Sequence, residues 1–193
     1  MGAQRGPVRG PGGGSGGDSG DPGRGGPGGR DDRADSAVDF AVLLWREDSA
    51  WQATGLPERS AGDLVALLAV ARQQPSEAGT IVLVSVADDF FVALRCTGRH
   101  EQFLLSDVTA AREWELAGEV LDRLGLQPSD ADDLDAVTPA GDLDMFAELG
   151  MESMEVAALC GDPELYPDEM LQSIADRIGA GALFHRVVDA TVV

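Results

Sequence analysis

The sequence predicts an α+β protein in which a hairpin, a helix, a three-stranded meander and a second helix form an antiparallel sheet domain. Within the hairpin and within the meander, strand-like segments follow one another across short turns, so these strands are expected to pair antiparallel. Helix-like patterns dominate after residue 141, which predicts a C-terminal helical subdomain. The first 36 residues show neither pattern, which predicts a disordered N-terminal tail.

The predicted tail at 1–36 is rich in Gly, Pro, Arg and Asp. Fourteen of its residues are glycine and none is aromatic. Ordering it would cost backbone entropy that no burial could offset. The remainder has the usual size of a domain. Its predicted parts are a sheet domain at 37–126, an acidic linker at 127–141, a helical subdomain at 142–187 and a C-terminal tail at 188–193.

The first predicted strand covers residues 38–45, where apolar side chains occupy both alternating faces. Such a strand is typical of a sheet that is covered on both sides. Residues 46–50 turn the chain, and 51–56 can return as the hairpin partner before Pro57 ends it. Ser60 is then the predicted N-cap of a helix. The apolar stripe of this helix consists of Leu64, Leu67, Leu68 and Ala71.

A three-stranded meander follows, with strands at 80–86, 90–96 and 102–106. Asp107 comes directly before an amphipathic helix that Gly125 ends, so its carboxylate is a predicted N-cap. Ser106 and Asp107 are therefore interpreted as a strand end and a helix cap, not as catalytic groups. The buried stripe of this helix is predicted at Trp114, Ala117, Leu121 and Leu124.

The stretch at 127–141 is acidic and interrupted by two prolines, which indicates a solvated linker. Three helices are predicted beyond it, at 142–150, 151–160 and 167–179. The last begins with Pro167 at its first position and carboxylates in its first turn, as helix starts prefer. These helices are expected to pack either against one another or onto the sheet.

The net charge of -20 falls on residues 37–193, because the predicted tail holds five Arg and five Asp. The folded part therefore has 29 acidic residues against nine Arg. Such a surface repels nucleic acid and anionic membranes, so we expect the folded part to bind neither of them directly. The same surface favours basic protein partners. The candidate partner-binding residues are the acidic run of the linker, Asp130, Asp132, Asp133 and Asp135. Leu134 and Asp135 occupy the places of a ligand and of the turn glycine in a calcium loop, which argues against calcium.

No motif of catalytic type is present. The two histidines and two cysteines lack metal-ligand spacing, and the glycine clusters follow no strand, so neither a metal site nor a phosphate loop is predicted. Cys96 and Cys160 fall in apolar segments and are expected to be buried thiols. We expect a non-enzyme without cofactors. With no signal-like start and no long apolar segment, a cytoplasmic location is expected.

Several segments, in order, resemble an actinobacterial family, the tRNA adenosine deaminase-associated proteins. They include "FAVLLWREDSAW", "FFVALRCTGRHEQFLLSD" and the C-terminal helix that begins with Pro167, Asp168 and Glu169, and the resemblance runs from Val38 to Arg186. It implies a small acidic accessory of the enzyme that makes inosine in tRNA anticodons, and it transfers no catalytic residues. The chain lacks the H-x-E and P-C-x-x-C pattern of the zinc deaminases themselves.

Two alternatives remain open. Besides the accessory role, one alternative is an acidic interaction module or nucleic-acid mimic that binds another basic partner. The other is a small-ligand protein or an enzyme with a pocket between the sheet and the helices. The oligomeric state is also open.

Overall fold

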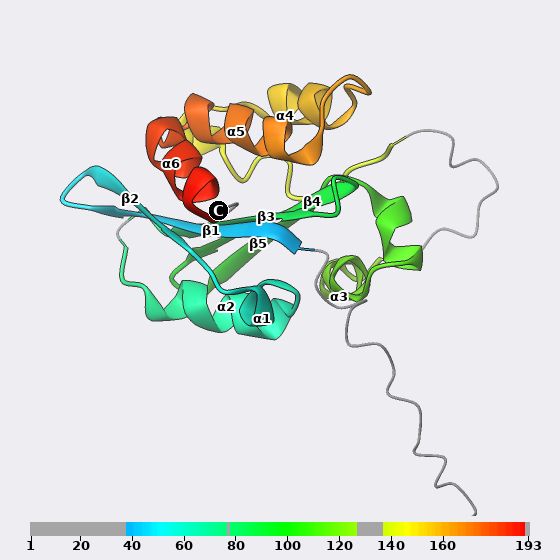
Figure 1. The fold of residues 1–193 in the computed structure, drawn as a ribbon, viewed down its shortest axis with the longest axis horizontal. Helices are drawn as coiled ribbons and strands as arrows, with labels where there is room; N and C mark the ends of the chain where they lie inside the picture. Colours follow the sequence, from blue (N-terminus) through cyan, green and yellow to red (C-terminus); the bar gives the residue numbers. More distant parts are fainter. Residues whose placement is uncertain (1–37, 77, 127–136, 192–193) are drawn as a thin grey trace, which may run out of the picture. The chain divides into compact units, whose positions relative to one another are not determined.

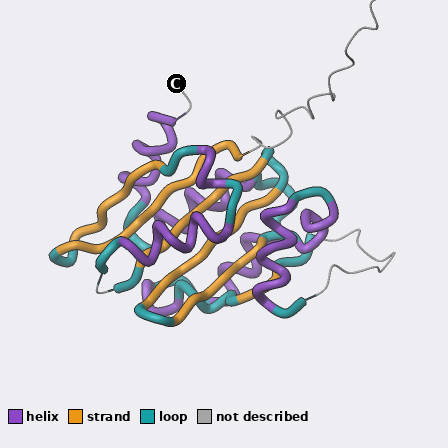
Figure 2. The backbone as a smooth tube through the Cα atoms, turned by 90° about the horizontal axis from the view of Figure 1, so that it is seen from below, coloured by secondary structure: helices purple, strands orange, loops and turns teal. Residues whose placement is uncertain are grey.

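The computed structural model describes residues 38–76, 78–126 and 137–191, all within one compact unit that spans 33–193. A six-stranded antiparallel sheet has the order β2-β1-β3-β4-β5-β6, which confirms the α+β class (Figure 1). Figure 2 shows the strands side by side. The strands are β1 (Val38–Glu47), β2 (Ala50–Gly55), β3 (Thr80–Val86), β4 (Phe90–Thr97), β5 (His100–Leu105) and β6 (Ala140–Gly141).

Helices cover both faces of this sheet. One face carries α1 (Glu58–Ala61), α2 (Leu64–Gln73), the 3-10 helix η1 (Val108–Arg112) and α3 (Glu115–Leu124). The other carries the 3-10 helix η2 (Ala147–Leu149), α4 (Ser153–Cys160), α5 (Pro167–Arg177) and α6 (Gly181–Thr191). In Figure 1, α4, α5 and α6 lie above the sheet, and α1, α2 and α3 lie below it. The C-terminal helices therefore pack onto the sheet, one of the two arrangements expected from the sequence.

The two-sided burial predicted for β1 is confirmed. Phe40 and Val42 face the α5 and α6 side, whereas Ala41 and Leu43 face the α2 side. The hairpin to β2 turns through Asp48 and Ser49, which have φ values of 50° and 67°. Positive φ at both central residues is typical of the type I′ turn, whose twist matches that of paired strands.

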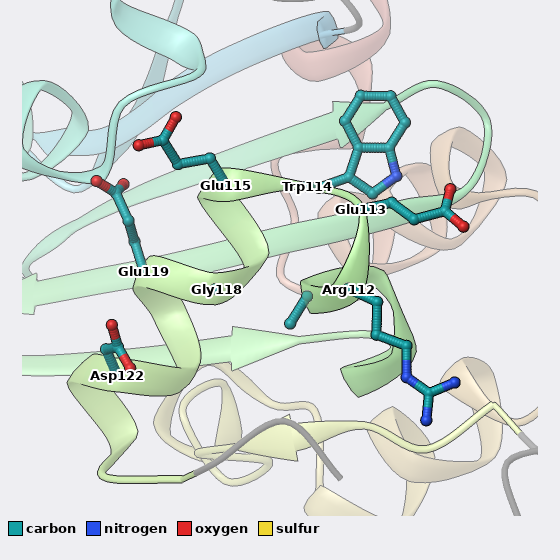
Figure 3. A pocket seen from close by; sticks show the side chains of 8 residues that line it. Arg112, Glu113, Trp114, Glu115, Gly118, Glu119 and Asp122 are labelled. Atoms are coloured by element: carbon teal, nitrogen blue, oxygen red, sulfur yellow. The ribbon is translucent and has the colours of Figure 1, made fainter. Parts of the chain in front are cut away.

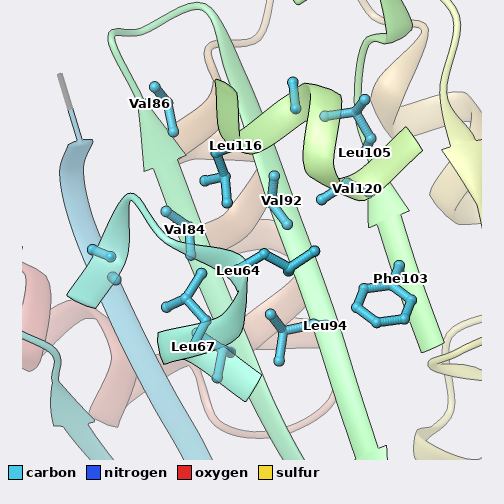
Figure 4. Close-up of a cluster of buried hydrophobic side chains, with 14 of the residues drawn as sticks. Leu64, Leu67, Val84, Val86, Val92, Leu94, Phe103, Leu105, Leu116 and Val120 are labelled. Carbon is cyan, nitrogen blue, oxygen red and sulfur yellow. The ribbon is translucent and has the colours of Figure 1, made fainter. Parts of the chain in front are cut away.

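The predicted meander is confirmed as β3, β4 and β5, and every residue of β3 is buried. The core on the α2 and α3 side brings leucines of the helices onto these strands (Figure 4). In Figure 4, Leu64 and Leu67 of α2 and Leu116 of α3 point toward Val92 and Leu94 of β4. Burying such aliphatic side chains contributes about 1.5–3 kcal/mol each relative to exposing them.

The helix predicted to start at Ser60 is two helices instead. Ser60 lies within α1, and Gly62 separates α1 from α2. Asp63 caps α2, where its carboxylate accepts a hydrogen bond from the Ala66 N–H at 2.9 Å. The prediction of Ser60 as the cap was wrong because an equally good capping side chain stands three residues later, closer to the apolar stripe.

The segment after β5 also begins as predicted and then divides. Asp107 caps η1, and the chain leaves helical geometry at Trp114 before α3 begins. Gly125 ends α3 with a φ of 70°, as predicted from the sequence. Of the predicted stripe, Ala117 and Leu121 are buried, whereas Trp114 and Leu124 are only half-buried. Leu116 and Val120 supply the rest of the buried face.

Three differences concern the C-terminal half. The predicted helix at 142–150 consists of turns and the short η2. Ala140 and Gly141, expected in the linker, pair with Leu105 and Leu104 as β6. A Cβ at position 141 would collide with the Phe103 carbonyl oxygen, so this close approach requires glycine. Helix α6 continues to Thr191, so residues 188–191 are helical where a tail was expected.

Candidate partner-binding site

A pocket of about 270 Å³ lies where the β3–β4 turn, the end of β5 and the start of α5 meet, and we call it the acidic pocket. It combines residues from four separate stretches of the chain, and the strand order brings the turn at 87–89 beside residues 106–107. Its lining residues are Asp88, Asp89, Ser106, Asp107, Val137, Cys160, Asp162, Pro163, Leu165, Tyr166, Pro167 and Met170.

The end of β5 forms one wall. Ser106 is 4% exposed and extends the ladder to β4 by one residue. Its N–H donates to the Phe91 carbonyl at 3.0 Å, and its Oγ accepts from the Phe91 N–H at 2.9 Å. The carboxylate of Asp107 accepts from the Thr109 N–H at 2.9 Å and from its hydroxyl at 2.6 Å. Strand end and helix cap, the roles predicted for these two residues, are both present, and the same residues line a pocket.

The β3–β4 turn forms a second wall and is held from two sides. Asp39 of β1 accepts hydrogen bonds from the Ser85 hydroxyl at 2.9 Å and from the Asp88 N–H at 3.1 Å. The Asp89 carboxylate accepts from the indole N–H of Trp114 at 3.0 Å. These hydrogen bonds hold the turn that carries Asp88 and Asp89 against β1 and Trp114.

The loop before α5 forms the third wall. The Asp162 carboxylate accepts from the Glu164 N–H at 3.0 Å, and the Glu169 carboxylate accepts from the Tyr166 N–H at 3.0 Å. Pro167 is the first residue of α5, as predicted. Tyr166 also lines the pocket and is 62% exposed, so it adds an aromatic residue that solvent and a partner can reach.

The charge of the acidic pocket has one sign. Its lining holds four aspartates and no Arg or Lys, on walls that include Leu165 and Met170. This combination suits a group that carries a cation on an apolar stem. Burial raises the pKa of the Cys160 thiol to about 12, which favours its protonated form near neutral pH.

A second hollow of about 400 Å³ lies on one continuous segment, residues 111–122 (Figure 3). Its side chains diverge, since Glu115 and Glu119 point to the side opposite Arg112. Glu119 is already engaged, because its carboxylate accepts from the Leu64 N–H at the start of α2 at 3.0 Å. We interpret this hollow as a consequence of packing between α2 and α3.

Within the described ranges, no group of three or more His, Cys, Asp or Glu side chains is placed to hold a metal ion. None of the helices in that same part of the chain is long and apolar enough to cross a membrane. The predicted partner-binding residues Asp130, Asp132, Asp133 and Asp135 lie outside the described residues. Val137, which lines the acidic pocket, follows that acidic run by two positions.

Sequence reasoning did not single out Asp88, Asp89 or Asp162. These three come from two turns that are far apart in the chain, and each looks like an ordinary turn aspartate. The signal that was available is the pair Ser106 and Asp107, whose place at a strand end marks the edge where the pocket lies.

Strand β4, whose sequence carries part of the resemblance, contains a buried cation two residues before its end. Arg95 is 4% exposed, and its guanidinium donates to the Met145 carbonyl at 2.6 Å and to the Ala78 carbonyl at 3.2 Å. It also pairs with Glu148 at 3.0 Å. Arg95 therefore fastens the segment before η2 to the sheet, which is a structural role.

Comparison with known proteins decides the family. The family model described as "Rv3753c-like tRNA adenosine deaminase-associated protein" matches residues 39–181. The chain belongs to this family. Protein Rv3753c of Mycobacterium tuberculosis (strain ATCC 25618 / H37Rv) is 31% identical over 158 residues, which cover 81% of this chain and 91% of that protein. No solved structure matches the chain.

The match to the deaminase-associated family confirms the resemblance drawn from the sequence. It runs from β1 to the first residue of α6. It therefore includes every residue that lines the acidic pocket, and also Arg95 with the residues that it binds. The description of the family indicates an association with tRNA adenosine deaminase.

Proposed function

We propose that this protein is a non-catalytic, acidic accessory protein that binds tRNA adenosine deaminase in the cytoplasm. The observation that carries the proposal is the family match, whose description names the association. The net charge of -20 supports it, since an enzyme that grips tRNA exposes basic surface to phosphates. An acidic protein can dock on such a surface without contacting tRNA itself.

The non-catalytic part of the proposal has its own support. The thiol of Cys160, which lines the acidic pocket, is held protonated by burial. The aspartates beside it serve turn and cap hydrogen bonds at Thr109, Trp114 and Glu164. A role in positioning or restraining the deaminase requires only a binding surface.

Binding at two salt concentrations tests this function. The purified protein is mixed with the deaminase of the same organism, and the dissociation constant is measured at low and at high salt. We expect clear binding at low salt that weakens as salt rises, because the screening length shrinks from about 10 Å at 0.1 M to about 3 Å at 1 M. Deamination of tRNA is then measured with and without the protein, and a change in rate is expected.

The outcome also separates the proposal from its alternative. Absence of binding at both salt concentrations would overturn the association and favour an acidic interaction module or nucleic-acid mimic for another basic partner. Binding that is indifferent to salt would keep the association and overturn the electrostatic mode of docking.

A further inference from the structure

We infer that the acidic pocket binds the side chain of one arginine presented by a basic partner protein. The identity of that partner as the deaminase rests on the proposed function, whereas the chemistry of the occupant rests on the pocket. The pocket is concave, lies at the end of the sheet and combines apolar walls with carboxylates of one sign.

The size of the pocket fits a side chain. Its volume of about 270 Å³ lies just below the range of about 300–1,000 Å³ found for small-molecule sites. Leu165 and Met170 provide apolar wall for the methylene stem of a long side chain, which gains by leaving water. The tip of that side chain then meets polar groups.

The negative charge of the pocket favours a side chain whose end group is a cation. Asp88 and Asp89 approach from the β3–β4 turn, and Asp162 approaches from the loop before α5. The lining contains no Arg or Lys to neutralise them. A phosphate or another anion would be repelled, so the occupant comes from a basic protein and not from tRNA.

Ser106 adds a buried polar group at the wall. Its Oγ uses one lone pair on the Phe91 N–H and, as a hydroxyl, retains a second lone pair that can accept a further hydrogen bond. Among the described residues, no hydrogen bond is donated by this hydroxyl. A guanidinium N–H that reached the wall could donate to it.

Tyr166 favours arginine over lysine. This residue lines the pocket and is 62% exposed, and aromatic faces attract the planar, weakly hydrated guanidinium. A guanidinium also presents several N–H donors in one plane and can bind two carboxylates at once, whereas an ammonium acts as a point charge.

The test uses the full chain and three variants. Asp88→Asn with Asp162→Asn removes two pocket charges but keeps the oxygen that accepts from the Glu164 N–H. Asn also tolerates the positive φ of 53° at position 88. Tyr166→Ala removes the exposed ring. The matched control is Glu47→Gln with Asp48→Asn, which removes two charges at the opposite end of β1.

Affinity for the deaminase is measured for each protein at low salt, after circular dichroism has shown that the variant is folded. We expect both pocket variants to bind about tenfold more weakly, as for the loss of an interface anchor, and the control to bind nearly as well as the unchanged chain. Equal affinities for pocket variants and control would overturn the inference and leave the proposed function standing.

A peptide arm keeps the test independent of the deaminase. Binding of a blocked Gly-Arg-Gly-Arg-Gly peptide and of its lysine counterpart is followed by calorimetry. We expect the arginine peptide to bind more tightly, and the pocket variants to lose that preference. If the deaminase does not bind at all, the proposed function fails, but this peptide result still supports the pocket. Equal binding of both peptides, or of neither, overturns the inference.

Discussion

Arg95 shows how one residue of a family motif is explained by packing. Its side chain crosses from β4 to the backbone of the segment before η2, where it satisfies a buried carbonyl that no neighbouring strand reaches. Its charged partner Glu148 is 81% exposed, so the ion pair itself lies mostly in water. The carbonyl hydrogen bonds, more than the ion pair, therefore make Arg95 important for stability.

Replacing Arg95→Met is expected to lower the free energy of unfolding by at least about 2 kcal/mol, since each buried group left unsatisfied costs about 1–3 kcal/mol. The control Glu148→Gln removes the ion pair alone and is expected to cost about 0–1 kcal/mol. Urea denaturation measures both. Equal losses for the two variants would show that the ion pair, and not the backbone contact, holds this segment.

Cys160 gives a second prediction at this scale, in the pH dependence of stability. Burial raises the pKa of this thiol from the ordinary value of 9.0 to about 12 in the folded protein. Above pH 9 the unfolded chain loses the proton while the folded chain keeps it. The contribution of this thiol to the free energy of unfolding is therefore fully present below pH 9. It is lost as the pH rises toward 12, by about 1.4 kcal/mol for each pH unit.

Urea denaturation between pH 8 and about 10.5 measures this slope. A Cys160→Ala variant serves as control and should show a shallower decline, even though it starts from a lower stability because the side chain is 1% exposed. Parallel curves for the two proteins would mean that this thiol titrates normally.

Among the elements, α2 permits a direct comparison of two possible caps. Asp63 accepts from the Ala66 N–H, whereas Ser60 lies inside α1. Asp63→Ala should therefore reduce stability by about 0.5–2 kcal/mol, the usual effect of losing an N-cap. Ser60→Ala should change it little. Thermal unfolding of the two variants measures both effects. A larger loss of stability for Ser60→Ala than for Asp63→Ala would show that Ser60 is the cap.

Strands β1 to β5 were predictable because the pattern and composition of each segment indicate a strand. In β1 both faces are apolar, and in β3 five of the seven residues are apolar and all seven are buried, as is typical of strands between two helical layers. Helix α6 also carries a signal, since Leu183, Phe184, Val187 and Val188 recur at helical spacing. The predicted helix at 167–179 ends at Gly179, and no helix was predicted beyond it.

Other features had no local signal. β6 has two residues, and its pairing depends on Gly141 approaching the backbone of Phe103. The acidic pocket likewise depends on the order of the strands, which places the turn at Asp88 beside Asp107 and beneath the loop at Asp162. Periodicity within a segment reports which face is buried, but not which distant turns become neighbours.

At the scale of the whole molecule, the two helical layers and the sheet depend on one another. Phe91 and Leu104 of the sheet are buried by the same cluster that contains Phe146 of the η2 segment and Ile174 of α5. Removal of the C-terminal helices would expose one complete face of the sheet, and the helices alone would lose the surface on which they pack.

We therefore expect neither of two fragments, residues 37–126 and 142–193, to fold alone, although the sequence suggested separate parts there. Each fragment is heated while its circular dichroism is followed, and no cooperative transition is expected. Mixing the two should restore at least part of the transition of the full chain. A sharp transition in either fragment alone would establish it as an independent domain.

The position of β3 and β4 in the middle of the sheet has a consequence for motion. Each has a strand on both sides, and helices cover both faces, so their amides are shielded by backbone pairing and by side chains at once. Their deuterium uptake should require opening of the entire unit, whereas β2 at the sheet edge can fray by itself. The turn at Asp88 joins β3 to β4 and so connects the acidic pocket to the two strands that we expect to exchange most slowly. A partner that docks there would meet a surface that scarcely moves before binding.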